Sequence, residues 1–328
     1  TLFRSDLNNR KYISYDDAQN QKYFEHNYLG TDSIDKTKRT SIKNTIGIAL
    51  QEGFNKWAKA GLTAFLSYEY RNFALTDTTN IPGQRIINNY KESSLSIGGE
   101  LSKKQGKLLH YNILGELAIA GEDAGQFSVE GRGDLNLRLF GDTVRLDVNA
   151  FIKNQNPVFY FRHFQSKHYW WDNNDLSKIM RTRLEGKLSL NRWGTQLRAG
   201  VENIKNYTYL ANASIPVKDS EGNVTGFKNN AAVRQHSGNI QIFTAMLQQK
   251  LKVGIFHLDG EVAYQKSSEQ DILPLPELSA YGNLYMKFGL AKKVLQIEMG
   301  ADVRYFSKYY APDYSPVIGQ FYNQNPEI

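Results

Sequence analysis

Apolar and polar residues alternate strictly along much of this chain, and no other feature constrains its fold as strongly. Between Phe127 and Leu139, the odd positions hold Phe, Val, Gly and Leu, while the even positions hold Ser, Glu, Arg, Asp and Asn. A period of two is typical of a β-strand with one apolar face and one polar face. The same period recurs at 183–191, 196–202, 256–265 and 295–305, and also at 144–152, where Phe151 breaks it. We therefore expect an all-β chain.

The connections between these stretches fall into two classes that alternate along the chain. Short turns are expected near 103–107, 141–142, 191–194, 252–254 and 291–293. Longer polar loops are expected at 74–89, 156–179, 206–235, 267–278 and 307–317. Short turns at one end of a row of antiparallel hairpins and long loops at the other are typical of an outer-membrane β-barrel. The pattern predicts an antiparallel, up-and-down transmembrane β-barrel.

Strand length separates a barrel wall from a half-buried soluble sheet. Strands of soluble proteins usually contain about 5–6 residues. The strands expected here contain roughly a dozen, which at about 3.3 Å per residue is some 40 Å of strand. Tilted by about 40°, such a strand crosses the ~30 Å hydrocarbon core of a bilayer. No apolar run approaches the roughly 20 residues of a membrane-spanning helix, so any crossing must be made by strands.

The strand count predicts that the sequence is a fragment of a larger barrel. We count about thirteen strands, including a partial one beginning near Val317. Bacterial single-chain barrels contain an even number of strands, and this chain ends without a closing amphipathic strand. Residues 1–40 are expected to form a strand remnant and a long polar loop. Residues 41–328 are expected to form barrel wall, with the C-terminal closing strands missing.

Composition excludes several classes of function. The 328 residues include no cysteine, which rules out disulfides, thiolate catalysis and zinc–cysteine sites. The net charge is +7, but Lys and Arg are interleaved with Asp and Glu, which argues against nucleic-acid binding. Two explanations of the positive net charge remain. One is ordinary solvated surface charge, and the other is a lumen that mildly favours anions.

Enzyme signatures are weak. His163 and His168 share a loop with Asp172 and Asp175 and could bind a metal, but without helical spacing or cysteine partners a polar loop is the better reading. A membrane phospholipase needs its Ser and His on the lipid-facing wall, whereas His110 belongs to the polar face. We expect no enzymatic activity, no metal and no cofactor.

The polar face of the strands is the one constellation with functional content. A Lys or Arg facing lipid costs about 2–4 kcal/mol at the bilayer midplane, so this face must look into a water-filled lumen. Mixed rings of charge can bias ion selectivity, and cross-strand ion pairs that only stiffen the wall are the alternative. The residues expected to line the pore are Glu130, Arg132, Asp134, Arg138, Arg145, Asp147, Lys153, Arg181, Arg183, Glu185, Lys187, Arg198, Glu202, Glu298, Asp302 and Arg304.

Aromatic residues lie near the expected strand ends, as in the interfacial girdles of a barrel. The general enrichment of aromatics in strands is the alternative explanation. The girdle residues predicted are Trp57, Tyr68, Tyr70, Trp193, Tyr207, Tyr264 and Tyr305. The Pro-rich loop at 273–276 is expected to cap the outer mouth of the barrel rather than fold inward as a constriction.

Short runs in the last third of the chain carry a family resemblance. They are QKSS at 265–268, LPLPEL at 273–278, YGNLY at 281–285, RYFSKYYAPDYSP at 304–316 and GQF at 319–321. These runs resemble the putative porin family of Bacteroidetes outer membranes, and residues 44–73 resemble it more weakly. The resemblance implies an outer-membrane barrel, passive diffusion of solutes and no catalytic residues. Family members also extend to a terminal strand that ends in an aromatic residue.

The function predicted is a porin-like channel of the bacterial outer membrane. Small solutes or ions would diffuse through a polar, mixed-charge lumen that weakly favours anions. A structural or accessory barrel subunit with a plugged lumen is one alternative, and the barrel of a TonB-dependent transporter lacking its plug is another. Outer-membrane lipid is the expected partner, with other outer-membrane proteins or a homo-oligomer as further options and no nucleic acid.

Overall fold

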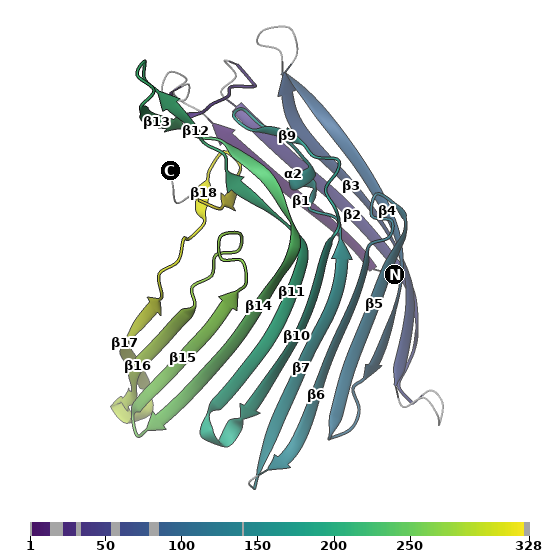
Figure 1. Ribbon diagram of the computed structural model, residues 1–328. Helices are drawn as coiled ribbons and strands as arrows, with labels where there is room; N and C mark the ends of the chain where they lie inside the picture. Colours follow the sequence, from purple (N-terminus) through teal and green to yellow (C-terminus); the bar gives the residue numbers. More distant parts are fainter. Residues whose placement is uncertain are drawn as a thin grey trace.

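One long antiparallel sheet makes up most of the computed structural model. The structure describes residues 2–13, 22–30, 34–53, 60–78, 85–139 and 141–324. The sheet has 13 strands in the order β1-β2-β3-β4-β5-β6-β7-β10-β11-β14-β15-β16-β17, each hydrogen-bonded to the next strand along the chain. Figure 1 shows the sheet curved into an open trough with β1 and β17 at its two edges. The predicted all-β, up-and-down antiparallel fold is confirmed.

The strands are long enough to cross a membrane. The shortest contain 12 residues and the longest 23. Their bounds are β1 Leu2–Ile13, β2 Ile34–Leu50, β3 Gly61–Thr78, β4 Arg85–Lys103, β5 Leu109–Gly121, β6 Phe127–Leu139, β7 Asp142–Gln155, β10 Ile179–Leu190, β11 Thr195–Asn212, β14 Ala231–Val253, β15 Phe256–Ser267, β16 Leu278–Leu290 and β17 Leu295–Phe306. Among the described residues, no helix has the length and apolarity needed to span a bilayer.

Short elements lie in the connections. The segment between β7 and β10 contains α2 (Phe159–Arg162), β8 (His163–Gln165) and β9 (Trp170–Asp172). The hairpin of β12 (Ile215–Lys218) and β13 (Val224–Lys228) lies between β11 and β14. After β17 come β18 (Asp313–Ser315) and β19 (Gln320–Tyr322). Two single-turn 3-10 helices, η1 (Asn191–Trp193) and η2 (Ala291–Lys293), close short turns.

Most connections follow the sorting expected from the sequence, with one departure. At the short-turn end, Gly194 closes η1 with a φ of +63°, and a Cβ there would collide with the Lys250 carbonyl oxygen. At the opposite end, residues 122–126 join β5 to β6 by a tight turn rather than a long loop. Gly121 begins that turn with a φ of +87°, where a side chain would be strained. This short connection places the carboxylates of Glu122 and Asp123 close to the wall.

The segment 156–178 identifies the concave face of the sheet. Phe73 of β3 stacks on Phe159 of α2, with ring centroids 3.8 Å apart. The same segment contacts β11, on the far side of the curve. A segment that reaches both β3 and β11 must lie within the curve. Residues directly opposite in neighbouring strands share a face, so the strand registers extend this assignment across the sheet.

Two boundaries expected from the sequence are wrong. β1 pairs with β2 along its length, and β2 begins at Ile34, so a wall boundary at residue 40 falls inside a strand. The alternation is hidden there because both faces of β2 are polar near the long loops. No wall strand begins near Val317, whose side chain is only 2% exposed and packs against other residues on the concave side.

Candidate functional site

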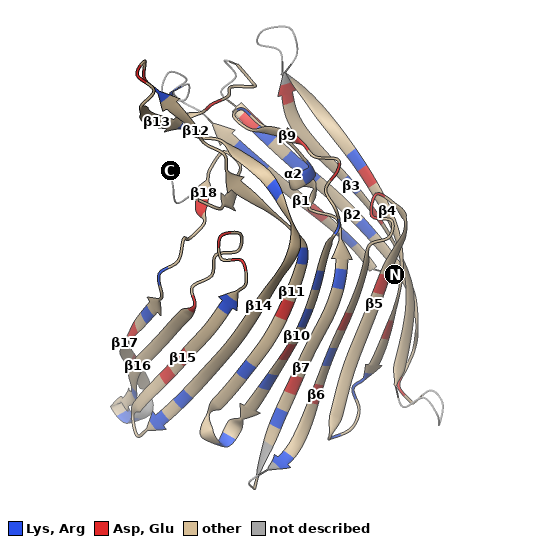
Figure 2. Ribbon diagram, viewed as in Figure 1, with Lys and Arg blue, Asp and Glu red and all other residues tan. Residues whose placement is uncertain are grey.

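The charged residues predicted to line the pore all lie on the concave face. The β6–β7 register places Glu130 opposite Phe151 and Asn136 opposite Arg145, and the β10 and β11 registers continue the same face. On β17, Arg304 lies opposite Tyr281 and Asp302 opposite Asn283. Figure 2 shows the Lys, Arg, Asp and Glu residues distributed along the strands of the trough. The pore-lining role of these residues stays a prediction.

Many of these charges form cross-strand ion pairs. Lys153 Nζ lies 2.5 Å from Glu130 Oε1, which joins β7 to β6. Lys187 Nζ lies 3.1 Å from Asp147 Oδ2, which joins β10 to β7. Arg181 pairs with Glu202 of β11 at 2.5 Å. The wall of the concave face is therefore linked by charge from β6 to β11, and much of that charge is neutralised within the wall.

Some cations on this face have only distant counter-charges. Arg132 is 71% exposed, and its ion pair with Glu130 spans 3.8 Å. Arg198 lies 3.9 Å from Glu185, and the guanidinium of Arg304 lies 5.5 Å from the centre of the Tyr281 ring. Arg132 and Arg198 also line a hollow of ≈ 400 Å³ near the short-turn end of the face. The solvated charges of this hollow are thus mainly positive.

The aromatic residues predicted to form girdles are distributed over the convex face and one short turn. Tyr68, Tyr264 and Tyr305 are 48%, 40% and 53% exposed on the convex face, and Trp193 in η1 is 55% exposed. Tyr70 shares the convex face of β3 with Tyr68, and Tyr207 stacks on Tyr209 at the long-loop end of β11. Trp57 lies outside the described residues. A membrane girdle stays a prediction for this set.

At the long-loop end, an apolar cluster lies across the concave face. It is built by four segments far apart in sequence: 22–30, 156–178, 229–233 and 313–324. We call the buried residues they share with β11 the mouth cluster. Its members are Phe24, Phe164, Tyr169, Trp171, Leu210, Ala231, Val317, Ile318 and Tyr322.

Backbone hydrogen bonds join the segments of the mouth cluster to one another. Tyr28 N–H donates to the Lys167 carbonyl at 2.7 Å, and Asn229 N–H donates to the Tyr23 carbonyl at 2.7 Å. Asn323 N–H donates to the Leu210 carbonyl of β11 at 2.8 Å. The Tyr169 hydroxyl, in a side chain 2% exposed, donates to Asn229, and burial raises the pKa of this phenol. The four segments thus form one packed unit.

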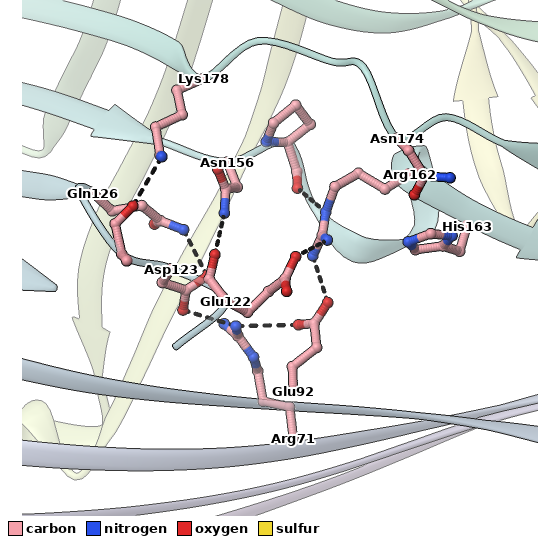
Figure 3. A network of polar contacts seen from close by, with 12 residues as sticks. Arg71, Glu92, Glu122, Asp123, Gln126, Asn156, Arg162, His163, Asn174 and Lys178 are labelled. Carbon is pink, nitrogen blue, oxygen red and sulfur yellow. Dashed lines mark hydrogen bonds and ion pairs between the residues drawn. The ribbon is translucent and has the colours of Figure 1, made fainter. Parts of the chain in front are cut away.

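A network of ion pairs, buried except at Glu122, fixes the segment 156–178 to the wall (Figure 3). Arg162 of α2 lies 2.6 Å from Glu92 of β4 and 2.7 Å from Glu122. Arg71 of β3 lies 3.1 Å from the same Glu92 and 2.7 Å from Asp123. Glu122 and Asp123 come from the tight turn between β5 and β6. We call these five residues the wall ion-pair network.

The histidines of this segment do not converge. His163 pairs with Asp172 at 2.6 Å across β8 and β9, whereas the His168 ring stacks on Phe24 with centroids 3.9 Å apart. Among the described residues, no three His, Cys, Asp or Glu side chains gather as a metal site would require. Of the two histidines, only His168 therefore contacts the mouth cluster, whereas His163 lies against Phe159 and Tyr90.

Sequence reasoning missed both the mouth cluster and the wall ion-pair network. The sequence predicts a polar loop at 156–179, although this stretch contains the aromatic runs FYF at 159–161 and YWW at 169–171. That density of aromatics in a supposed loop was the available signal. For Arg71 and Glu92 no local signal exists, because their partners lie on other elements.

Comparisons with known proteins agree with this geometry. The family model described as "Putative porin" matches residues 3–328. No curated protein matches the sequence. Among solved structures, the siderophore receptor PirA from Pseudomonas aeruginosa is similar with a TM-score of 0.54 and 12% identity, over 83% of this chain and 49% of that one. The copper transporter OprC is similar with a TM-score of 0.51 and 12% identity, over 77% of this chain and 42% of that one.

A mutant of the ferric enterobactin receptor PfeA from Pseudomonas aeruginosa gives a TM-score of 0.55 at 12% identity, over 96% of this chain and 48% of the receptor. The chain therefore spans about half the length of the structures it matches. At such low identity, the likeness shows the barrel fold alone. Together with the family match it indicates the bacterial outer membrane as the location. By its sequence over nearly its whole length, this outer-membrane β-barrel chain belongs to the putative porin family.

Proposed function

We propose that this chain forms the wall of a passive diffusion channel for small solutes or ions, with a weak preference for anions. The observation that carries the proposal is the continuous charged face on the concave side of β5–β11. In a bilayer, charged side chains near the middle of a strand avoid a large free-energy cost only where they contact water. Arg132, Arg198 and Arg304 supply solvated positive charge, whereas Glu130, Glu185 and Glu202 are engaged in ion pairs.

Conductance of the full-length protein in planar bilayers tests this proposal. We expect ohmic conductance in symmetric salt, and a reversal potential of the sign set by anion flow when a salt gradient is applied. Cation selectivity would overturn the anion preference. A correctly inserted barrel that passes no ions at any voltage would overturn the channel itself.

A second candidate is a structural or accessory barrel subunit with a closed lumen. The mouth cluster favours it, because a packed unit lies across the concave face at the long-loop end. Phe159→Ala distinguishes the two candidates, since it removes the stack between the segment 156–178 and Phe73 of the wall. Conductance in the variant but not in the unaltered protein would favour a closed barrel. Equal conductance in both would favour an open channel past the cluster.

Active uptake, as the barrel of a transporter, is the third possibility. The matched structures named as a siderophore receptor and a copper transporter lend it support through their fold alone, at 12% identity. Uptake measured for the full-length protein in cells tests this function. Dependence of the uptake on an energy source would favour active transport over passive diffusion.

A further inference from the structure

The convex face of the sheet carries charge of one sign. The β11–β14 register shifts between Lys205 and Tyr207. Between this irregularity and the short turns, the described side chains of the convex face include no carboxylate, and the charged ones are all lysines. Except for Lys103, they lie toward the long-loop ends of their strands. They are Lys11, Lys36, Lys38, Lys91, Lys103, Lys205 and Lys266.

The concave face uses charge differently, because it carries carboxylates among its cations, and many of these opposite charges pair across strands. On the convex face, Lys11 lies directly opposite Lys36 in the β1–β2 register. Like charges in directly opposite positions destabilise a strand pair. Lysines placed this way are favourable only if negative charge reaches them from outside the sheet. In a membrane, the head groups of anionic lipids supply such charge.

One region of the convex face also offers a place for a lipid chain. A groove of ≈ 620 Å³ crosses β10, β11, β14 and β15. Leu184, Val201, Phe243 and Tyr264 form its apolar floor, and each is between 40% and 53% exposed. The rings of Phe243 and Tyr264 lie side by side, with centroids 6.4 Å apart.

A polar rim borders this floor on its long-loop side. Lys266 follows Tyr264 by two residues along β15, and Asn203 follows Val201 by two along β11, so both lie one step nearer the loops. Gln241 lies directly opposite Asn203 and joins the rim. The rim therefore offers an ammonium and two amides above an apolar surface. Glu202 also lines the groove, but its carboxylate pairs with Arg181 on the concave side of the sheet. Because the long loops of such barrels are extracellular, the rim belongs to the outer leaflet.

We propose that this groove binds a phosphorylated lipid of the outer leaflet. The acyl chain lies on the Leu184–Val201–Phe243–Tyr264 floor, and the phosphate accepts hydrogen bonds from Lys266 and from the amides of Asn203 and Gln241. The order of floor and rim fits a ligand with a hydrocarbon tail toward the bilayer centre and an anionic head toward the loops. The groove lies on the face opposite the concave charges. Lipid binding in it can therefore be tested whether or not the protein conducts ions.

Lipid binding to the full-length protein in neutral detergent tests this site. The probes are lipid A with both phosphates and the same lipid with its phosphates removed, each quantified by native mass spectrometry. We expect the phosphorylated probe to bind more tightly. Lys266→Gln should weaken its binding about fivefold, the effect of one lysine near a charged membrane surface. Binding of the dephosphorylated probe should not change.

Two further variants separate head-group recognition from general effects. Lys218→Gln, in the exposed β12–β13 hairpin at the same end of the molecule, removes an equal charge away from the groove and should leave binding unchanged. Phe243→Ala should weaken both probes, because it removes part of the floor. Equal binding of the two probes would overturn the proposal, as would equal losses from Lys266→Gln and Lys218→Gln. A protein that co-purifies through Phe243, with neither lipid bound, would assign the groove to a protein partner instead.

Discussion

The concave face differs sharply between its two ends. Toward the short turns it is lined by solvated and paired charges, with Arg132 71% exposed. Toward the long loops it is covered by a dry cluster in which Tyr169 and Phe164 are each 2% exposed. The first region is made by residues of neighbouring strands, and the second by segments distant in sequence. The wall therefore provides a polar surface, whereas the loop segments cover that surface at the mouth.

The largest expected effect comes from removing an aromatic side chain at the mouth. Phe159→Ala leaves a cavity against Phe73, and loss of a buried Phe costs about 3–5 kcal/mol. We expect the segment 156–178 to detach, seen as faster amide hydrogen exchange in that segment. Phe159→Leu, which keeps most of the volume, should retain most of the protection. Unchanged exchange in Phe159→Ala would mean that the segment is not held by the stack.

The wall ion-pair network should contribute nearly as much. In Arg162→Ala, Glu92 loses one of its two arginines but keeps Arg71, so we expect the lower end of the range for a broken buried pair, about 3 kcal/mol. Hydrogen exchange of 156–178 measures the loss. Arg132→Ala, which removes a solvated arginine from the same face, is the matched control and should leave exchange unaltered. Equal effects of the two variants would remove the distinction between the regions.

The mouth cluster should also loosen in alkaline solution. Burial raises the pKa of Tyr169 above the ordinary value of 10.0, so its phenol stays neutral in the folded state while an exposed phenol would ionise. The stabilisation is complete below pH 10 and declines as pH rises further, by up to about 1.4 kcal/mol per pH unit for one such group. Exchange in 156–178 as a function of pH, corrected for its intrinsic rate, reports this. Tyr169→Phe should reduce the dependence, and an undiminished slope would assign it to other groups.

The smallest effect is expected at the charged end. Arg132→Glu should shift the anion-to-cation permeability ratio toward cations by about fivefold or less, because a solvated charge contributes at most about 1 kcal/mol. Reversal potentials in a salt gradient measure the shift. Lys218→Glu in the exposed β12–β13 hairpin serves as control. A shift toward anions would contradict the placement of Arg132 in the conducting path.

The contrast between the two regions also explains what the sequence could predict. Alternation in 127–139 and 295–305 located strands and faces, because a wall residue's orientation depends only on its own position along the strand. Placement of 156–178 depends on contacts with Phe24, Leu210 and Val317, which are distant in sequence. Alternation carries no information about such contacts. The polar edge of β2 was missed for a related reason, since near the loops neither of its faces is apolar.

The account depends on one claim, that the convex face contacts lipid and the concave face contacts water. Spin labels on β10 test this claim most directly. These 328 residues contain no cysteine, so single cysteine substitutions at Arg183, Leu184, Lys187 and Leu188 can each carry a label with no competing thiol in this chain. In the full-length protein in lipid bilayers, we predict collisions with a water-soluble nickel chelate at 183 and 187, and with oxygen at 184 and 188. The reverse pattern, or no alternation along the strand, would contradict the account.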